Sequence, residues 1–283
     1  MTAQQPVAKP DADATWPPAL ARGLLRADVL RSVRYRDGYA DLLGPSGPIH
    51  RSLAQRAMHS PIVAAIYERI WRPIMVAIMR LHGVSTSAER EKSADTLHIG
   101  GEQRVLDAAC GPGSFTGFFA DRLSGDGVVI GLDNSAAMME RAVRDNSSAR
   151  AVYLRGDARS LPFSNRVFDV VCCFAALHLV PEPMAALHEM VRVLAPGGRI
   201  AVMTTYGREP FLVRKGLELG ATICGVRVFD RATVPTFLAA AGLTDVEQKL
   251  RGVSQFVTAR RPEHETEFDV GVPGRLGRPQ KAY

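Results

Sequence analysis

The chain has 283 residues, and 46% of them are hydrophobic, enough for the core of one domain of ordinary size with further segments attached. Its formal net charge is +6, but no basic block marks the middle of the chain and aromatic residues make up only 7%. This composition argues against a nucleic-acid-binding surface. The cysteines at 110, 172, 173 and 224 match no zinc-binding spacing, so we expect a reducing compartment. The sequence shows no metal-binding cluster, so no metal is expected, although the Asp and His residues at the strand ends leave one open. No basic stretch followed by an apolar core opens the chain, which predicts a cytoplasmic protein without a signal peptide.

Residues 1–20 are rich in Ala, Pro, Asp and Gln and are expected to be disordered. Residues 21–100 are expected to form an N-terminal helical cap, with a short helix and a loop up to about residue 45. Within that cap, Ser60-Pro61 is a helix start and the apolar residues that follow recur at helical spacing up to residue 82. Charged residues interrupt this helix, so it does not suit a transmembrane span, although peripheral contact with a membrane stays open.

From residue 101 to residue 261 the pattern changes to alternating strands and helices. Strands are expected at 103–109, 127–132, 151–155, 167–174 and 198–204, and helices at 114–124, 135–145, 183–195 and 231–241. Residues 243–251 and 253–260 are close enough to form an antiparallel hairpin. We therefore predict an α/β fold with a Rossmann-like, seven-stranded, mostly parallel sheet, helices on both faces and a C-terminal antiparallel hairpin. Residues 206–230 are expected to form a lid insertion, and residues 262–283 a disordered tail.

Acidic residues and a glycine turn stand where successive strands end. Asp107 is followed by the Gly111-Pro112-Gly113 turn, Asp133 closes the second strand, and Asp157 follows the third. Ligands of open α/β sheets bind beyond the carboxyl ends of the strands, so these groups should meet in one crevice. Asp133 can bind ribose hydroxyls there or cap the helix that follows it. Asp157 can meet an adenine ring or be a plain turn residue.

The order of these motifs resembles that of class I S-adenosylmethionine-dependent methyltransferases, in the broad methyltransferase-11/UbiE-like branch. The resemblance rests on the glycine turn, Asp133, Gly156-Asp157-Ala158, Leu177-His178 and the turn at 194–198, and it covers roughly residues 100–260. It implies S-adenosylmethionine as cofactor. Where the family's first motif usually has Gly, this chain has Ala109.

The resemblance also implies roles for single residues. Asp107 would hold the turn and meet the amino group of the cofactor, Asp133 would bind both ribose hydroxyls, and Asp157 would take the adenine amino group. The remaining cofactor contacts would come from Ala109, Cys110, Gly111, Gly113, Asn134, Met138, Ala158, Phe174 and Leu177.

A nicotinamide-dependent oxidoreductase is the main alternative. Its Gly-x-Gly-x-x-Gly fingerprint has a third glycine where this chain has Thr116. No Tyr-x-x-x-Lys pair is present either.

The methyl acceptor is expected to be a small apolar or amphipathic molecule, such as a lipid, a quinone-like ring or another hydrophobic metabolite, methylated on oxygen or carbon. A sugar hydroxyl or a macromolecule is the alternative. His178, after the fourth strand, is the candidate general base, or else a wall residue that orients a ligand. His188 and Glu189 are expected at the surface. Candidate residues of the acceptor pocket are Tyr67, Trp71, Met75 and Tyr206. The pattern does not indicate an oligomeric state.

Overall fold

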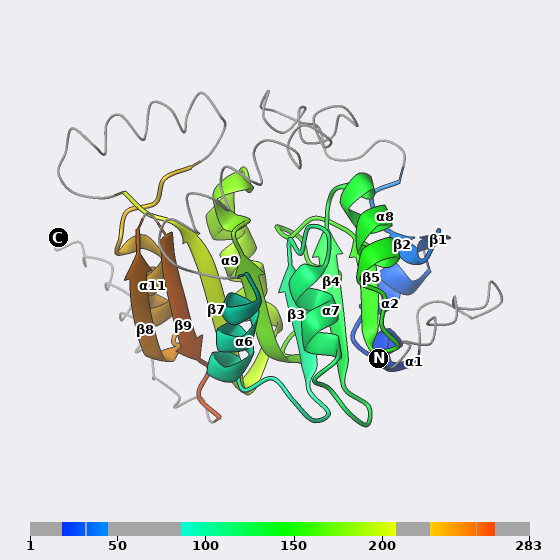
Figure 1. The fold of residues 1–283 in the computed structure, drawn as a ribbon, viewed down its shortest axis with the longest axis horizontal. Coiled ribbons are helices and arrows are strands. Elements are labelled where there is room, and N and C mark those ends of the chain that lie inside the picture. Colours follow the sequence, from blue (N-terminus) through cyan, green and yellow to red (C-terminus); the bar gives the residue numbers. More distant parts are fainter. Residues whose placement is uncertain (1–18, 32, 45–85, 208–226, 253, 264–283) are drawn as a thin grey trace, which may run out of the picture.

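The computed structural model describes residues 19–31, 33–44, 86–207, 227–252 and 254–263. Within this part, one nine-stranded sheet runs in the order β1-β2-β5-β4-β3-β6-β7-β9-β8 (Figure 1). From β2 to β7 neighbouring strands are parallel, while β1, β9 and β8 are antiparallel to their neighbours. The strands are β1 (Arg34–Arg36), β2 (Tyr39–Asp41), β3 (Arg104–Ala108), β4 (Val128–Asp133), β5 (Ala151–Arg155), β6 (Phe168–Phe174), β7 (Leu194–Thr205), β8 (Thr244–Arg251) and β9 (Ser254–Arg260).

The seven strands expected from the sequence are all present, but two more strands extend the sheet. β1 and β2 form a hairpin at one edge, where a loop was expected to follow a short helix. Asp37 and Gly38 make the two-residue turn, with φ of 41° and 89°, as the favoured hairpin turns require. Three-residue strands are too short to show an alternating pattern, and the exposed Arg34-Tyr35-Arg36 does not look like a sheet segment. The predicted number of seven strands was therefore wrong, because it lacked the two strands of this hairpin.

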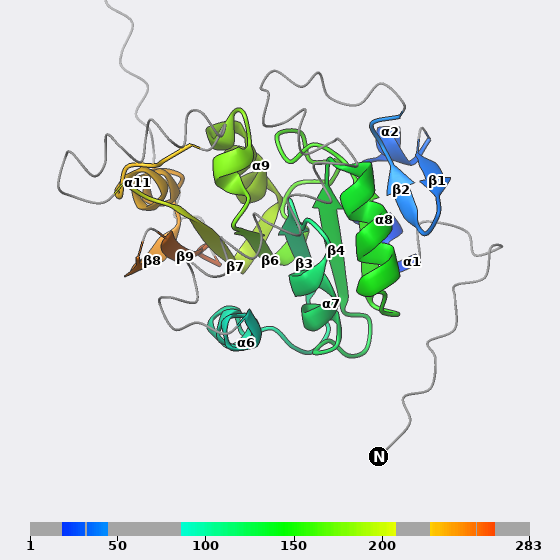
Figure 2. The same ribbon diagram turned by 45° about the horizontal axis from the view of Figure 1, so that its top comes forward.

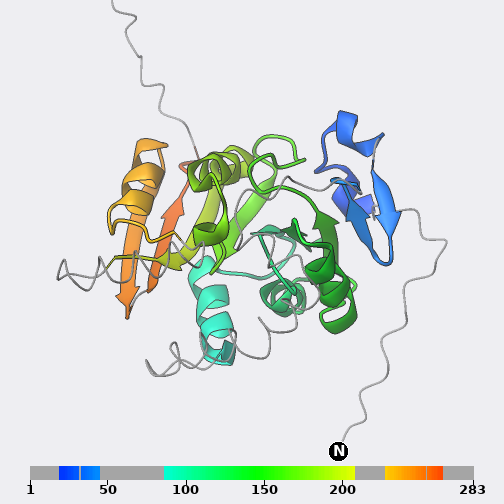
Figure 3. The ribbon, with the colours of Figure 1, turned by 90° about the horizontal axis from the view of Figure 1, so that it is seen from above.

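Helices cover both faces of the sheet (Figures 2 and 3). Because both faces are covered, side chains alternate along the parallel strands between two buried clusters. Leu106 and Ile130 belong to one cluster, and Val105 and Val129 to the other. One face carries α1 (Ala19–Arg22), α2 (Ala27–Leu30), α9 (Pro183–Val193) and α11 (Thr233–Ala240), and the other carries α6 (Thr86–Leu97), α7 (Ser114–Ala120) and α8 (Ala136–Asp145).

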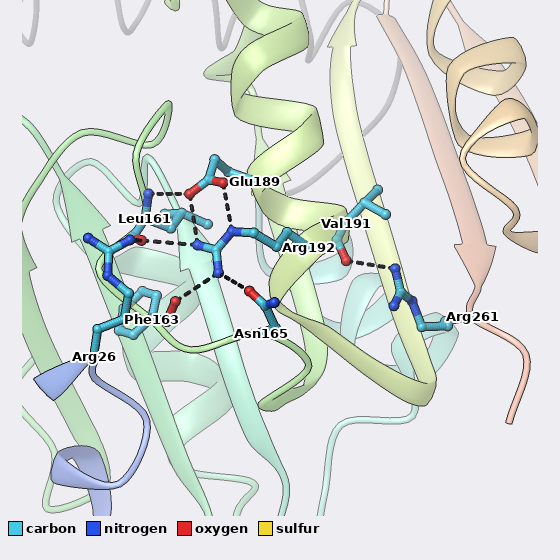
Figure 4. A network of polar contacts seen from close by, with 8 residues as sticks. All are labelled: Arg26, Leu161, Phe163, Asn165, Glu189, Val191, Arg192 and Arg261. Atoms are coloured by element: carbon cyan, nitrogen blue, oxygen red, sulfur yellow. Dashed lines mark hydrogen bonds and ion pairs between the residues drawn. The ribbon is translucent and has the colours of Figure 1, made fainter. Parts of the chain in front are cut away.

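Glu189 of α9 is not the surface residue that the sequence suggested. Its side chain is partly buried and accepts a hydrogen bond of 2.7 Å from the backbone N–H of Leu161, in the link between β5 and β6 (Figure 4). It also pairs with Arg192 at 2.7 Å. Arg192 in turn donates to the carbonyl oxygen of Phe163 at 2.9 Å and to the side chain of Asn165 at 2.7 Å. This network ties α9 to a link that has no helix of its own.

Several expected features lie outside the described residues. These are the helix over residues 61–82, with Tyr67, Trp71 and Met75, most of the expected lid and both tails. In the part of the chain that the structure describes, no helix is long and apolar enough to cross a membrane.

Candidate functional site

The glycine turn connects β3 to α7 through left-handed backbone. Gly111 has φ of 55° and Gly113 has φ of 75°. A Cβ added at Gly113 would lie 2.7 Å from the hydroxyl oxygen of the buried Tyr153, so this glycine is required by packing. A Cβ added at Gly111 would meet no atom within 4 Å. The space over Gly111 is therefore open to a ligand, and the space over Gly113 is filled by the protein.

Two alanines near this turn also have left-handed backbone. Ala109 follows β3 with φ of 57°, and Ala175 follows β6, the next strand of the sheet, with φ of 55°. This conformation costs a residue with a side chain about 1–2 kcal/mol. Such strain gathers at functional sites. A glycine at position 109, the residue usual in the family that the sequence resembles, would avoid this cost.

Asp133 stands at the end of β4 and braces the glycine turn. Its Oδ2 accepts a hydrogen bond of 3.0 Å from the N–H of Gly111, and its Oδ1 accepts one of 2.9 Å from the N–H of Ser135. Burial raises the pKa of Asp133, although backbone hydrogen bonds act in the opposite direction. The N-cap of α8 is Ser135, whose hydroxyl accepts from the N–H of Met138. Capping by Asp133, the simpler of its two expected roles, is thus taken by Ser135.

Asp107 lies beneath the turn, with 2% of its surface exposed. Its Oδ2 accepts a hydrogen bond of 2.7 Å from the hydroxyl of Thr116, which ties β3 to α7. Burial raises the pKa of Asp107 to about 7. The carboxylate therefore supports the turn from below, while its contact with a cofactor stays a prediction.

Asp157 is paired with a residue that the sequence did not single out. Arg159 donates from Nη2 to Oδ2 of Asp157 at 2.7 Å and from Nε to both carboxylate oxygens at 3.0 Å. Its Nη1 pairs with Glu182 at 3.0 Å. Burial acts to raise the pKa of Asp157, but the hydrogen bonds from Arg159 outweigh it and the pKa is lowered. The Asp157 carboxylate, which the resemblance assigns to the adenine amino group, is thus already bonded to Arg159.

His178 lies in a short 3-10 helix, Leu177–Leu179, just beyond β6. Its ring Nδ1 is buried and has no hydrogen-bond partner among the described residues. Burial lowers the pKa of His178 to about 4, so the ring is neutral near pH 7. The N–H of Arg227 donates to the carbonyl oxygen of His178 at 2.9 Å, and Thr205 binds the carbonyl of Arg227 at 2.8 Å. This joins the His178 segment to the end of β7, next to the partly exposed Tyr206.

The other predicted cofactor residues are spread over the same edge of the sheet. Leu177 is fully buried, and Phe174 packs with its ring centroid 4.5 Å from that of Phe115 and 6.0 Å from that of Phe256. Asn134 is exposed, whereas the side chains of Cys110, Met138 and Ala158 are partly buried.

Comparison with known proteins shows which proteins this chain is similar to. Residues 105–198, from β3 to the start of β7, match the family model described as a methyltransferase domain. This segment of the chain is similar to methyltransferase domains. The chain is 38% identical over 129 residues to a demethylmenaquinone methyltransferase of Lactiplantibacillus plantarum, covering 44% of this chain and 54% of the relative. It is 30% identical over 225 residues to an uncharacterized chloroplastic methyltransferase of Arabidopsis thaliana, covering 75% of this chain and 61% of the relative. The chain thus spans about half the length of the first of these relatives.

Solved structures agree on the fold. A SAM-dependent methyltransferase of Mesorhizobium loti aligns with a TM-score of 0.51 at 20% identity, covering 63% of this chain and 99% of that one. The [4+2]-cyclase SpnF aligns with a TM-score of 0.53 at 22% identity, covering 62% and 80%. The second protein is named for a different reaction, so likeness of fold alone leaves the reaction open.

Proposed function

We propose that this domain transfers a methyl group from S-adenosylmethionine to a small apolar acceptor of the quinone-like class. The observation that carries the proposal is the open space over the left-handed Gly111 beside the carboxylate of Asp133, at the ends of two neighbouring parallel strands. The choice of acceptor is supported by the demethylmenaquinone methyltransferases among the relatives, of which the one from Lactiplantibacillus plantarum is 38% identical.

The residues present fit such a cofactor. Gly111 leaves the main chain accessible, and Asp133 offers carboxylate oxygens to the ribose hydroxyls. The start of the helix after the turn does not match the dinucleotide-binding fingerprint Gly-x-Gly-x-x-Gly. In that fingerprint a third glycine lets helix and strand approach closely. Here Thr116 fills that place, and the close approach is made instead by Gly131 of β4, where a Cβ would lie 2.9 Å from the Thr116 hydroxyl oxygen. This favours a methyltransferase over a nicotinamide-dependent oxidoreductase.

When bound, the cofactor supplies an electrophilic methyl group, and the protein has to position the acceptor and exclude water. We assign His178 to the acceptor side, because its neutral ring presents a buried Nδ1 that has no partner within the described residues. A base with a pKa near 4 is weaker than ideal at neutral pH. We therefore expect His178 to orient the nucleophilic atom by accepting its hydrogen bond. Tyr206 and, outside the described residues, Tyr67, Trp71 and Met75 complete the proposed pocket. We also propose a catalytic domain at 101–261 with a lid at 206–230. The separate cap expected at 21–100 does not hold over residues 34–41, because β1 and β2 belong to the same sheet as the catalytic domain.

Calorimetry with S-adenosylhomocysteine and, separately, with NAD tests the choice of cofactor. We expect binding of the first, no binding of the second, and loss of binding in Asp133→Ala. Binding of NAD alone would overturn the proposal. Transfer of label from methyl-labelled S-adenosylmethionine to a soluble demethylated naphthoquinone tests the acceptor class. The naphthoquinone is kept chemically reduced as its quinol, so that its ring is nucleophilic, and the product is extracted into organic solvent. If the protein binds the cofactor but transfers no label to any quinone, the proposed methyltransferase activity stands and the proposed acceptor class is refuted.

A further inference from the structure

The N-terminal hairpin is built into the edge of the sheet next to the candidate site. β2 pairs in parallel with β5, so that Asp41 lies opposite Arg155, and β5 pairs with β4, so that Arg155 lies opposite Asp133. Asp41, Arg155 and Asp133 thus form one row across three neighbouring strands at their carboxyl ends, the edge at which ligands of such sheets bind.

The side chain of Arg155 connects the hairpin to the loop that follows Asp133. Its Nη1 pairs with Oδ2 of Asp41 at 3.0 Å, and only 10% and 3% of the two side chains are exposed. The same nitrogen donates to the carbonyl oxygen of Gly44 at 2.9 Å, while Nε donates to the carbonyl oxygen of Asn134 at 3.1 Å. One guanidinium therefore holds together the end of β2, the end of β5 and the loop between β4 and α8.

Asp41 uses its second oxygen to shape the chain beyond β2. Its Oδ1 accepts hydrogen bonds of 3.0 Å from the N–H groups of Leu43 and Gly44. The N–H of Leu42 donates to the carbonyl oxygen of Arg155 at 3.0 Å. Leu42 then lies beside Gly156, since a Cβ added at Gly156 would be 3.8 Å from the Leu42 Cδ1 atom. The segment from Asp41 to Gly44 forms a wall next to the expected adenine position.

We propose that Asp41 and Arg155 are positioning residues of the cofactor site and that the N-terminal hairpin, through Asp41, helps to hold that site in its binding conformation. This inference rests on the proposed function. Arg155 fixes the carbonyl of Asn134 and so the loop that presents Asp133, and Asp41 holds Arg155 in that pose. Breaking a buried pair by removing one charge leaves the other uncompensated, so the loss of Asp41 should release the loop. A lysine at 155 keeps the charge but lacks the planar fork that serves Asp41 and Asn134 together.

The test compares Asp41→Asn and Arg155→Lys with Glu189→Gln. Glu189 is a matched control because it likewise pairs with an arginine and accepts from a backbone N–H, but on α9. Each full-length variant is titrated with S-adenosylhomocysteine by calorimetry and unfolded in urea. Hydrogen exchange over residues 131–139 is measured without cofactor, as a readout that does not depend on binding. Asp41→Asn keeps the oxygen that caps Leu43 and Gly44, so it removes the ion pair with little other change.

We expect both site variants to bind about tenfold more weakly, the effect of losing roughly 1.4 kcal/mol from one charge-assisted contact. They should also exchange faster over 131–139, while Glu189→Gln loses stability but binds within about twofold of the wild type. Wild-type affinity and exchange in both site variants would overturn the inference and leave the proposed function standing. An equal loss of affinity in the control would also overturn it, since general destabilisation would then suffice. A wild type that does not bind would refute the proposed function and this inference together.

Discussion

Gly111→Ala separates what the glycine turn needs for folding from what it needs for binding. The added methyl group meets no protein atom within 4 Å, so the cost to folding is limited to the left-handed backbone at φ of 55°. That conformation costs an alanine about 1–2 kcal/mol. The same methyl group would occupy the space in which we place the cofactor. We therefore expect a modest loss of stability together with a loss of binding far larger than that loss would explain.

Gly113→Ala is the matched comparison on the same turn. Its φ of 75° brings a similar backbone cost, but its methyl group would lie 2.7 Å from the hydroxyl oxygen of Tyr153. That oxygen is held by a 2.8 Å hydrogen bond to the carbonyl of Asn146, so relief requires the ring to move. Overpacking adds about 1–3 kcal/mol. Gly113→Ala should thus destabilise the protein by about 2–5 kcal/mol.

Urea unfolding measures the stability of both variants, and calorimetry with S-adenosylhomocysteine measures binding by those that remain folded. We expect Gly113→Ala to lose more stability than Gly111→Ala. We expect Gly111→Ala to lose more affinity for S-adenosylhomocysteine than its loss of stability explains. If Gly111→Ala binds S-adenosylhomocysteine like the wild type, the open space over Gly111 does not hold the cofactor and the reasoning fails.

Three further predictions concern Ala109, Asp107 and His178. Ala109→Gly should raise the free energy of unfolding by about 0.5–1 kcal/mol, because relief of left-handed strain exceeds the added entropy of the unfolded chain; a decrease in urea unfolding would show that the strain is absent. Burial raises the folded-state pKa of Asp107 to about 7, above the unfolded value of about 3.9, so the folded state binds the proton more tightly and the wild type loses stability as the pH rises from about 4 to about 7. Asp107→Asn should lack this loss, and parallel stability profiles of the two proteins between pH 4.5 and about 7.5 would contradict it. His178→Gln should lower turnover about tenfold or more while binding of S-adenosylhomocysteine is retained. Because the pKa of His178 is lowered to about 4, the wild-type rate should show no inflection from this group between about pH 6 and 8, and such an inflection, lost in the variant, would assign His178 to proton transfer instead.

Much of the fold could be predicted because its signals are local. Apolar runs at 103–109 and 127–132 lie within a residue or two of β3 and β4, and the Gly-Pro-Gly turn does join a strand to a helix. Asp107 and Asp133 lie at or next to the ends of β3 and β4. They share one edge of the sheet because parallel strands have their carboxyl ends on the same edge. These features depend on residues close together in the chain, where side-chain period and turn chemistry act directly.

The tertiary structure decided which groups these residues meet. Thr116 binds Asp107, and Ser135 rather than Asp133 caps α8. Arg159 lies on Asp157, a contact between near neighbours that only side-chain conformation settles. The hairpin shows the limit most clearly, because three-residue strands have no readable period and become strands only by pairing with the edge of a sheet that already exists.

The sequence by itself determined the methyltransferase-like sheet, the glycine turn and the acidic residues along one edge. Only the tertiary structure joined Asp41 to Arg155, 114 positions later in the chain, and so brought the N-terminal hairpin to the site. The physical reason is that a buried ion pair depends on the burial and the geometry of both partners together. The residues near Asp41 or near Arg155 in the chain reveal neither property.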